Sequence, residues 1–280
     1  MNIRKRYLPF GWYPESKKEI LSEISAMEPQ EHTVSNVSAS ISPHAGWAFC
    51  GDKIYTSLKY IPENTDTVII LGGHNPGGMT YLYYEEDAWE LPGGIMEKDA
   101  DFTETVNSLS LLSGFNIQPE VYADNTVEVI MPMLSVLYPE IKWSAWRVPA
   151  DRRAEEFGRI LFEASLKLNR KIFVVGSTDL THYGPSYGFE PDTCGKMPQE
   201  WVKQNDMEFI SYLLNMDAGN ALESAEKKKS ACSSGAAAAA VSYAGYAGST
   251  KGRLISYSTS YSIYPSDSFV GYASILWENR

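Results

Sequence analysis

Three of the four histidines share one feature: each follows the carboxyl end of a predicted buried strand. The strands and their histidines are 37–42 with His44, 67–72 with His74, and 171–177 with His182. In open α/β sheets, ligands bind at this edge of the sheet. Imidazole is the commonest metal ligand in proteins, and it titrates near neutral pH. We therefore predict that the three histidines share one functional pocket.

The chain also offers anionic groups that could complete a metal site. Two histidines and one anionic ligand, with open positions left, suit iron or a similar transition metal. Asp179, Glu128 and Cys232 are candidates, and their wide separation in the sequence does not select one of them. Cys232 stands at the start of a predicted helix, where the helix N-terminus favours a thiolate. A thiolate is the form of cysteine that binds metals or attacks electrophiles.

Two further features indicate structure rather than chemistry. The loop 72–78 is rich in glycine but lacks both the Walker lysine and the dinucleotide glycine spacing. We interpret it as a loop that needs unusual backbone angles. The fourth histidine, His32, lies in a polar stretch and is predicted to be exposed.

Apolar strands alternate with helical segments along the whole chain, which predicts one α/β domain over residues 1–280. The predicted strands are 37–42, 67–72, 81–91, 142–148, 171–177, 252–263 and 269–277. The predicted helices are 15–27, 52–61, 97–112, 126–137, 151–168, 199–214, 217–229 and 233–247. Such alternation is typical of a three-layer α/β/α sandwich with a mostly parallel central sheet. The segment 81–91 and the closing pair of strands indicate antiparallel pairing at the sides, hence a mixed sheet.

Composition and charge argue against several classes of protein. The net charge of -11 repels the phosphates of nucleic acid, and no basic run is long enough to overcome it. No stretch of about 18 apolar residues could span a membrane. The N-terminus lacks the apolar core of a signal peptide, so we expect a cytoplasmic protein. Three cysteines are too few for a disulfide framework.

Several short motifs, taken together and in this order, resemble those of the Memo family, also known as protein B of the AmmeMemoRadiSam system. They are Pro43-His44-Ala45-Gly46-Trp47, Leu71-Gly72-Gly73-His74, Asp124-Asn125-Thr126-Val127-Glu128, Ser177-Thr178-Asp179-Leu180-Thr181-His182-Tyr183-Gly184, Cys232, and Val270-Gly271-Tyr272-Ala273. The resemblance runs from about residue 37 to the C-terminus. Each motif alone has little specificity, but their shared order is specific.

This resemblance implies a fold similar to the LigB-like subunit of class III extradiol dioxygenases, which use non-haem ferrous iron. It also implies a metal site at His44, His74 and Cys232. Asp179 and His182 would then line the same pocket.

The sequence departs from the family pattern around this site. Asn75, Asn125 and Ile130 stand where the family often has histidine. Cys232 is followed by two serines rather than by glycine. A dioxygenase would use the missing imidazoles to move protons or orient substrate. The departures therefore affect the residues expected for catalysis more than the residues expected to bind the metal.

The leading functional hypothesis is a non-haem, metal-dependent redox enzyme of dioxygenase-like type. Iron is the metal we expect for an enzyme, although a site of two histidines and a cysteine also accepts copper or zinc. His182 would be the acid–base group, with Asp179 orienting it. Glu128 would hold the substrate or a ligand histidine.

Two alternatives use the same pocket. The first is a non-catalytic module that binds a peptide or another ligand, and the second is a reversible carrier of iron or copper. We expect a small-molecule or peptide ligand in each case. The resemblance adds an AMMECR1-like protein and a radical SAM protein of the same system as possible partners.

Overall fold

The computed structural model describes residues 1–280 except 28–33, 35, 121, 196 and 280, so His32 lies outside the described residues. Within the described part, a nine-stranded sheet has the order β10-β12-β2-β9-β3-β8-β4-β7, and β11 pairs with β12. Its strands are β2 (Val37–Ser42), β3 (Thr67–Gly72), β4 (Tyr81–Tyr83), β7 (Ile117–Pro119), β8 (Lys142–Arg147), β9 (Ile172–Ser177), β10 (His182–Tyr183), β11 (Gly252–Thr259) and β12 (Phe269–Glu278).

The centre of the sheet is parallel. Strands β2, β9, β3 and β8 pair in parallel. In β3, Val68 and Ile70 pack on one face of the sheet, whereas Ile69 and Leu71 pack on the other. A strand that is buried on both faces needs a continuous apolar run, and this is why 67–72 could be predicted from the sequence.

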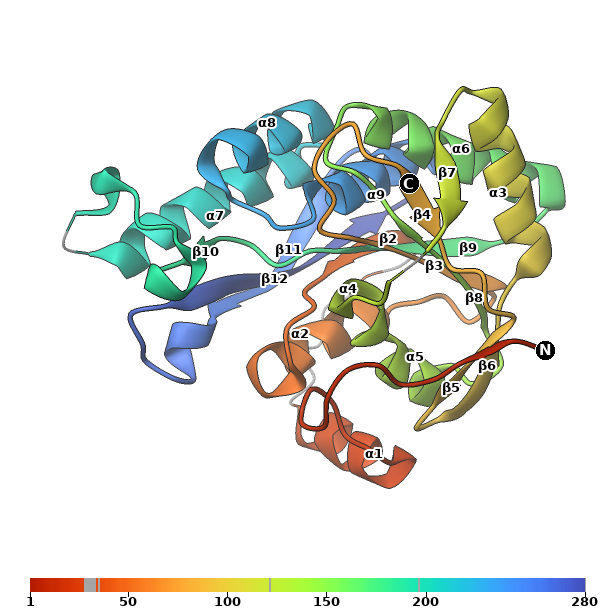
Figure 1. Ribbon diagram of the computed structural model, residues 1–280, viewed down its shortest axis with the longest axis horizontal. Helices are drawn as coiled ribbons and strands as arrows, with labels where there is room; N and C mark the ends of the chain where they lie inside the picture. Colours follow the sequence, from red (N-terminus) through yellow and green to blue (C-terminus); the bar gives the residue numbers. More distant parts are fainter. Residues whose placement is uncertain (28–33, 35, 121, 196, 280) are drawn as a thin grey trace.

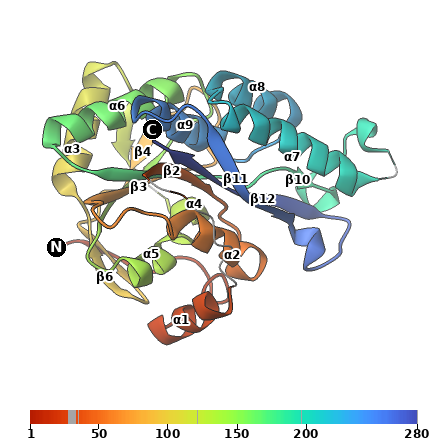
Figure 2. The same ribbon diagram turned by 180° about the vertical axis from the view of Figure 1, so that it is seen from behind.

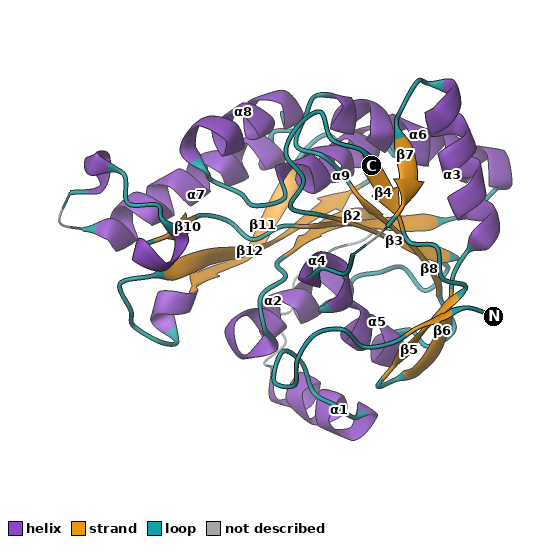
Figure 3. Ribbon diagram, viewed as in Figure 1, coloured by secondary structure: helices purple, strands orange, loops and turns teal. Residues whose placement is uncertain are grey.

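Helices cover both faces, as Figure 1 and Figure 3 show. On one face lie α3 (Ala100–Leu112), α6 (Arg153–Leu168), α7 (Pro198–Leu214), α8 (Ala218–Lys228) and α9 (Ser234–Tyr246). On the other lie α1 (Lys17–Ala26), α2 (Trp47–Leu58), α4 (Asn125–Glu128) and α5 (Met131–Leu137). The reverse view in Figure 2 shows the same three layers. The predicted three-layer α/β/α sandwich is therefore confirmed.

Antiparallel pairs border the parallel centre on both sides, which makes the sheet mixed, as predicted. Strand β12 pairs antiparallel with both β2 and β11. On the other side, β4 pairs antiparallel with β8. None of the helices in the described residues is both long and apolar enough to cross a membrane.

The single strand predicted at 81–91 is wrong. The structure divides it into β4 and β5 (Ala88–Leu91), and β5 joins a separate three-stranded sheet with β1 (Ile3–Arg4) and β6 (Gly94–Glu97). The break falls at a run of three acidic residues, 85–87. One of them, Glu86, forms an ion pair with Arg4, so local charge interrupts the apolar alternation.

Two predicted helices also differ from the structure. The predicted helix 126–137 is two helices, α4 and α5, with Pro132 in the first turn of α5. Proline lacks the N–H that the interior of a helix requires, so the helix restarts there. The predicted helix 52–61 begins earlier, at Trp47, whose N–H bonds to the carbonyl of Trp12.

Helix α9 begins two residues after Cys232, and it packs closely against α6. Its alanine run 236–240 is fully buried. A Cβ atom added at Gly158 of α6 would contact the Ala239 carbonyl and lie 2.8 Å from Ser242 Cβ. Only small residues allow the two helices to approach this closely.

We predict that Gly158→Ala lowers the free energy of unfolding by about 1–3 kcal/mol, because the added methyl group overpacks the α6–α9 contact. Gly219→Ala in α8 is the matched control, since a Cβ added there would lie 3.7 Å from the nearest neighbouring atom, Glu155 Oε1. That variant should be neutral or more stable by about 0.5–1 kcal/mol. Denaturant unfolding measures both, and equal stability of the two variants would contradict the packing argument.

Candidate metal centre

Three side chains meet at the carboxyl edge of the parallel strands. His44 follows β2, His74 follows β3, and Cys232 precedes α9. His44 Nε2 lies 3.2 Å from His74 Nε2 and 3.2 Å from Cys232 Sγ. The three potential ligand atoms all lie within 4.8 Å of one another. The structure thus brings together the three residues that the sequence analysis named as metal ligands.

The His44 ring is held in one tautomer by Ser177 at the end of β9. His44 Nδ1 lies 2.9 Å from Ser177 Oγ, and that hydroxyl donates its proton to the Thr126 carbonyl at 2.5 Å. A hydroxyl has one proton, so Ser177 accepts from the Nδ1–H of His44. The lone pair of Nε2 then faces His74 and Cys232, which is the arrangement that a metal ligand needs.

The backbone around His44 is held on both sides. Its N–H donates to Asp179 Oδ1 at 2.7 Å, and its carbonyl accepts from Asn125 Nδ2 at 2.9 Å. Asn125, which stands where the family often has histidine, therefore has a structural contact with the ligand loop. The side chain of His44 is 1% exposed, so the ring is fixed by packing as well.

His74 is held differently, by a carboxylate. Its Nδ1 lies 3.6 Å from Asp124 Oδ2, and 43% of its side-chain surface is exposed. The chain reaches it through Gly73, whose φ is +99°. A Cβ at Gly73 would lie 2.6 Å from Arg147 Cβ, so glycine is required for both its angle and its size.

Cys232 lies just before α9, whose N-cap is Ser233. Its N–H donates to the Asp179 carbonyl at 3.2 Å, and the N–H of Ser233 donates to Thr178 Oγ1 at 3.1 Å. The loop after β9 therefore holds the cysteine loop in place. The helix N-terminus favours negative charge on the sulfur.

His44, His74 and Cys232 lie close enough to shift one another's pKa values. Burial opposes ionisation of the Cys232 thiol, but the charge and hydrogen bond of His44 hold its pKa well below the usual value. Burial alone would lower the pKa of His74, whereas the neighbouring Asp124 carboxylate and Cys232 raise it to about 10. A metal ion binds the deprotonated forms of these groups, so its binding would release protons.

Asp179 and His182, the predicted acid–base pair, lie in the loop after β9 and at β10. Asp179 is buried, and its Oδ2 is 3.9 Å from His44 Nε2. His182 Nδ1 lies 3.0 Å from the Leu180 carbonyl, and its ring stands edge-on to Tyr187. Among the hydrogen bonds of the described residues, none joins His182 to the three ligand side chains.

Glu128, at the end of α4, is bound through one oxygen by the N-terminal segment. Its Oε1 accepts hydrogen bonds from Tyr7 N, Leu8 N and Tyr13 Oη, at 2.9, 2.8 and 2.9 Å. The carboxylate thus anchors the N-terminal segment, and these bonds leave its Oε1 no part in holding substrate or a ligand histidine.

Sequence reasoning missed the residues that orient the rings, Ser177 and Asp124. Both lie in motifs that the resemblance already contained. Ser177 ends β9 at the same edge as the histidines, and this position was the one available signal. The rings that they face, His44 and His74, lie far away in the sequence, so spacing could not identify these contacts.

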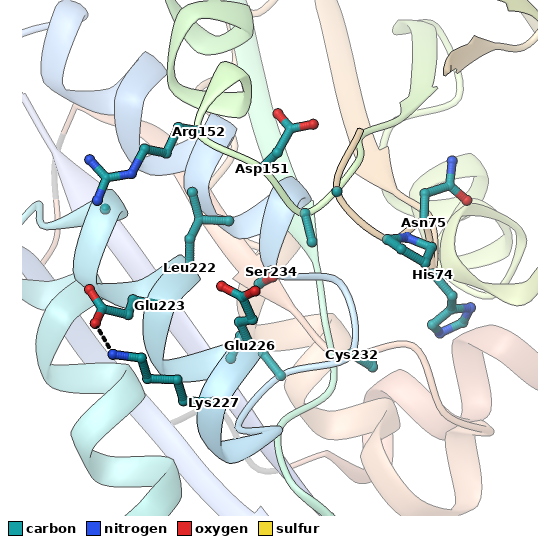
Figure 4. A pocket seen from close by; sticks show the side chains of 16 residues that line it. His74, Asn75, Asp151, Arg152, Leu222, Glu223, Glu226, Lys227, Cys232 and Ser234 are labelled. Carbon is teal, nitrogen blue, oxygen red and sulfur yellow. Dashed lines mark hydrogen bonds and ion pairs between the residues drawn. The ribbon is translucent and has the colours of Figure 1, made fainter. Parts of the chain in front are cut away.

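A cleft of about 860 Å³ opens on one side of the cluster. His74 and Cys232 line it, whereas His44, Asp179 and His182 do not. Figure 4 shows His74 on the side of this space opposite Leu222 and Glu226 of α8, with Cys232 between them along its lower edge. A ligand in the cleft would therefore meet His74 and Cys232 before it reached His44.

The family model described as "Memo-like protein" matches residues 10–276. Curated relatives named as MEMO1 family proteins are similar over most of their length. The protein from Thermococcus onnurineus is 28% identical, with 95% of this chain and 96% of the relative covered. The protein from Thermococcus kodakarensis is 29% identical, with 86% and 87% covered.

A solved structure of an uncharacterized protein from Escherichia coli K12 is 12% identical, with a TM-score of 0.44, covering 86% of this chain and 99% of that one. The family match spans both ligand histidines, the cysteine and every strand of the parallel centre. The chain belongs to the Memo family.

Proposed function

We propose that this protein binds a transition-metal ion through His44, His74 and Cys232 and acts as a non-haem, metal-dependent redox enzyme on a small organic ligand. The observation that carries the proposal is the convergence of the three ligand atoms within 4.8 Å at one end of a cleft. Three protein ligands at an open cleft leave coordination positions free for a substrate, as catalytic metal sites require.

The residues present fit a metal by their chemistry as well as by their spacing. His44 directs the Nε2 lone pair inward, because Ser177 accepts the proton of Nδ1. Cys232 supplies a thiolate. When bound, a redox-active metal supplies Lewis acidity and electron transfer, which side chains alone do not provide.

Asp179 holds two ligands at once in this proposal. Its side chain accepts from the N–H of His44, and its carbonyl accepts from the N–H of Cys232. His182 is proposed as the acid–base group. Its Nδ1–H donates to the Leu180 carbonyl, which leaves Nε2 as the atom that takes up or releases a proton.

The second candidate function is reversible carriage of iron or copper. The exposed His74 ring favours it, because a ligand that is 43% exposed could release or transfer the metal at the cleft. A soft thiolate also favours copper or zinc over iron. Turnover separates the enzyme from the carrier, and metal content separates both from a module that only binds a peptide or another ligand.

The first test is turnover. We predict that protein loaded with ferrous iron under anaerobic conditions consumes O₂ when a suitable substrate, such as a catechol, is added, and that His182→Ala lowers the rate about 100-fold or more. His182→Gln tests whether a hydrogen-bonding amide can replace the titrating ring. Full metal occupancy without O₂ uptake on any substrate in a panel would favour the carrier.

Metal preference depends on Cys232. We predict that Cys232→Ala lowers metal affinity and that Cys232→Asp shifts preference from copper or zinc towards iron, because a carboxylate is a harder ligand. Copper, zinc and iron bound under reducing conditions measure this. Cys50→Ser is the control, since Cys50 is buried in α2 and its Sγ donates to the Ala45 carbonyl. Unchanged metal content in Cys232→Ala would show that the thiol is not a ligand.

Orientation of His44 depends on Ser177. We predict that Ser177→Ala weakens metal binding about 10–100-fold, because the ring loses the acceptor that fixes its tautomer. Ser40→Ala is the matched control, since Ser40 is also a fully buried serine of the parallel sheet and its hydroxyl has no hydrogen-bond partner among the described residues. Equal metal dissociation constants for the two variants would remove the role of Ser177.

A further inference from the structure

We propose that Arg147 is a positioning residue for the metal site, acting through Asp124 on the ring of His74. This inference rests on the proposed metal site. Arg147 is the last residue of β8, next to the end of β3, and its side chain is 0% exposed. It contacts neither the cleft nor a ligand atom, so any effect on the metal passes through another residue.

Arg147 belongs to a row of side chains with alternating charge that runs from the surface to His74. In order, the row is Glu86, Arg4, Glu120, Arg147, Asp124 and His74. The three outer contacts are ion pairs of 2.8–2.9 Å. The two inner contacts are longer, 3.7 Å from Arg147 Nη1 to Asp124 Oδ2 and 3.6 Å from Asp124 Oδ2 to His74 Nδ1.

The charge of Arg147 is only partly balanced by Glu120, its closest anionic partner, and its Nη2 also donates to the Tyr122 carbonyl. Its Nη2 bonds to Glu120 Oε1, and the same oxygen bonds to Arg4. Its Nη1 has no hydrogen-bond partner in the described part of the chain and faces Asp124. A fully buried guanidinium is costly unless anions surround it, so Arg147 stabilises a carboxylate at Asp124 and draws it to this position.

The two oxygens of Asp124 are divided between two tasks. Oδ1 accepts from the N–H and the hydroxyl of Thr126, which fixes the carboxylate at the start of α4. Oδ2 is left to face both Arg147 and His74. A carboxylate held in this way fixes the tautomer and the orientation of a ligand histidine.

His74 depends on this contact more than His44 does on its own partner. His44 is 1% exposed and is held by packing, by Ser177 and by its backbone bonds. His74 is 43% exposed, and Asp124 is the partner that faces its Nδ1. Arg147 also packs against Gly73, the residue before His74, so it limits the path of the loop.

The competing account is that the row only joins the N-terminal segment to the sheet. Under that account, changes in the row alter stability but leave the metal site unchanged. A double-mutant cycle separates the two accounts, because residues that act through one another give non-additive effects.

The test measures cobalt affinity, by competition with a chelator, for the full chain and for Asp124→Asn, Arg147→Gln and the double variant. We expect each single change to weaken cobalt binding about tenfold or more. The double variant should bind cobalt no more weakly than the single variant with the lower affinity. Arg147→Lys should recover part of the affinity, since it keeps the charge. Arg4→Gln is the control. It disrupts the outer row without touching Asp124, and its affinity should stay within about twofold.

Absorption of the bound cobalt gives a second measurement that a purely structural role would not change. The sulfur-to-cobalt band of Cys232 should persist in Asp124→Asn and Arg147→Lys, whereas the ligand-field bands should shift as His74 loses its orientation. If the unaltered protein binds cobalt but the effects are absent or additive, the role of Arg147 is overturned while the metal site stands. If the unaltered protein binds no cobalt, the proposed function itself fails.

Discussion

Asp179 joins the two most distant parts of the site with two hydrogen bonds. Its side chain holds the backbone of His44, and its carbonyl holds the backbone of Cys232, which lies 188 residues later. Asp179 lies two residues after β9, and β9 stands between β2 and β3, the strands that lead to the two histidines. The order of the parallel sheet therefore brings these side chains together.

The two histidines are fixed by different physical means, and this gives the site two unlike sides. The His44 side is buried and held by short hydrogen bonds and packing. The His74 side is half-exposed and held by charge, through Asp124 and the buried Arg147. The cleft opens on the second side. The open side of the site is thus the side whose orientation depends on electrostatics, while the buried side is fixed by packing.

Much of the fold could be predicted from the sequence, because strands buried on both faces require continuous apolar runs. The strand 67–72 matches the structure residue for residue for this reason. The strand 37–42 matches as well, although serines alternate with its apolar residues. The shared edge of three histidines followed from the same argument. Spacing left Asp179, Glu128 and Cys232 open as the third ligand, and only the resemblance to the Memo family indicated Cys232.

What the sequence did not indicate comes mostly from contacts that connect distant parts of the chain. From the sequence, Glu128 is expected to be a free carboxylate near the predicted pocket. In the structure, residues more than 100 positions earlier donate hydrogen bonds to its Oε1. Pro132 divides a helix whose apolar period continues across it. In the sequence, Arg147 is a polar residue at the end of a predicted strand. The residues next to it do not indicate the buried ion pairs that it forms.

The central claim is that His44, His74 and Cys232 bind one metal ion together. Anomalous diffraction at the iron edge, from crystals grown anaerobically with ferrous iron, tests it most directly. The account predicts a single peak about 2.0–2.3 Å from both Nε2 atoms and the sulfur. Iron bound elsewhere, or held by one of these residues without the other two, would contradict the account.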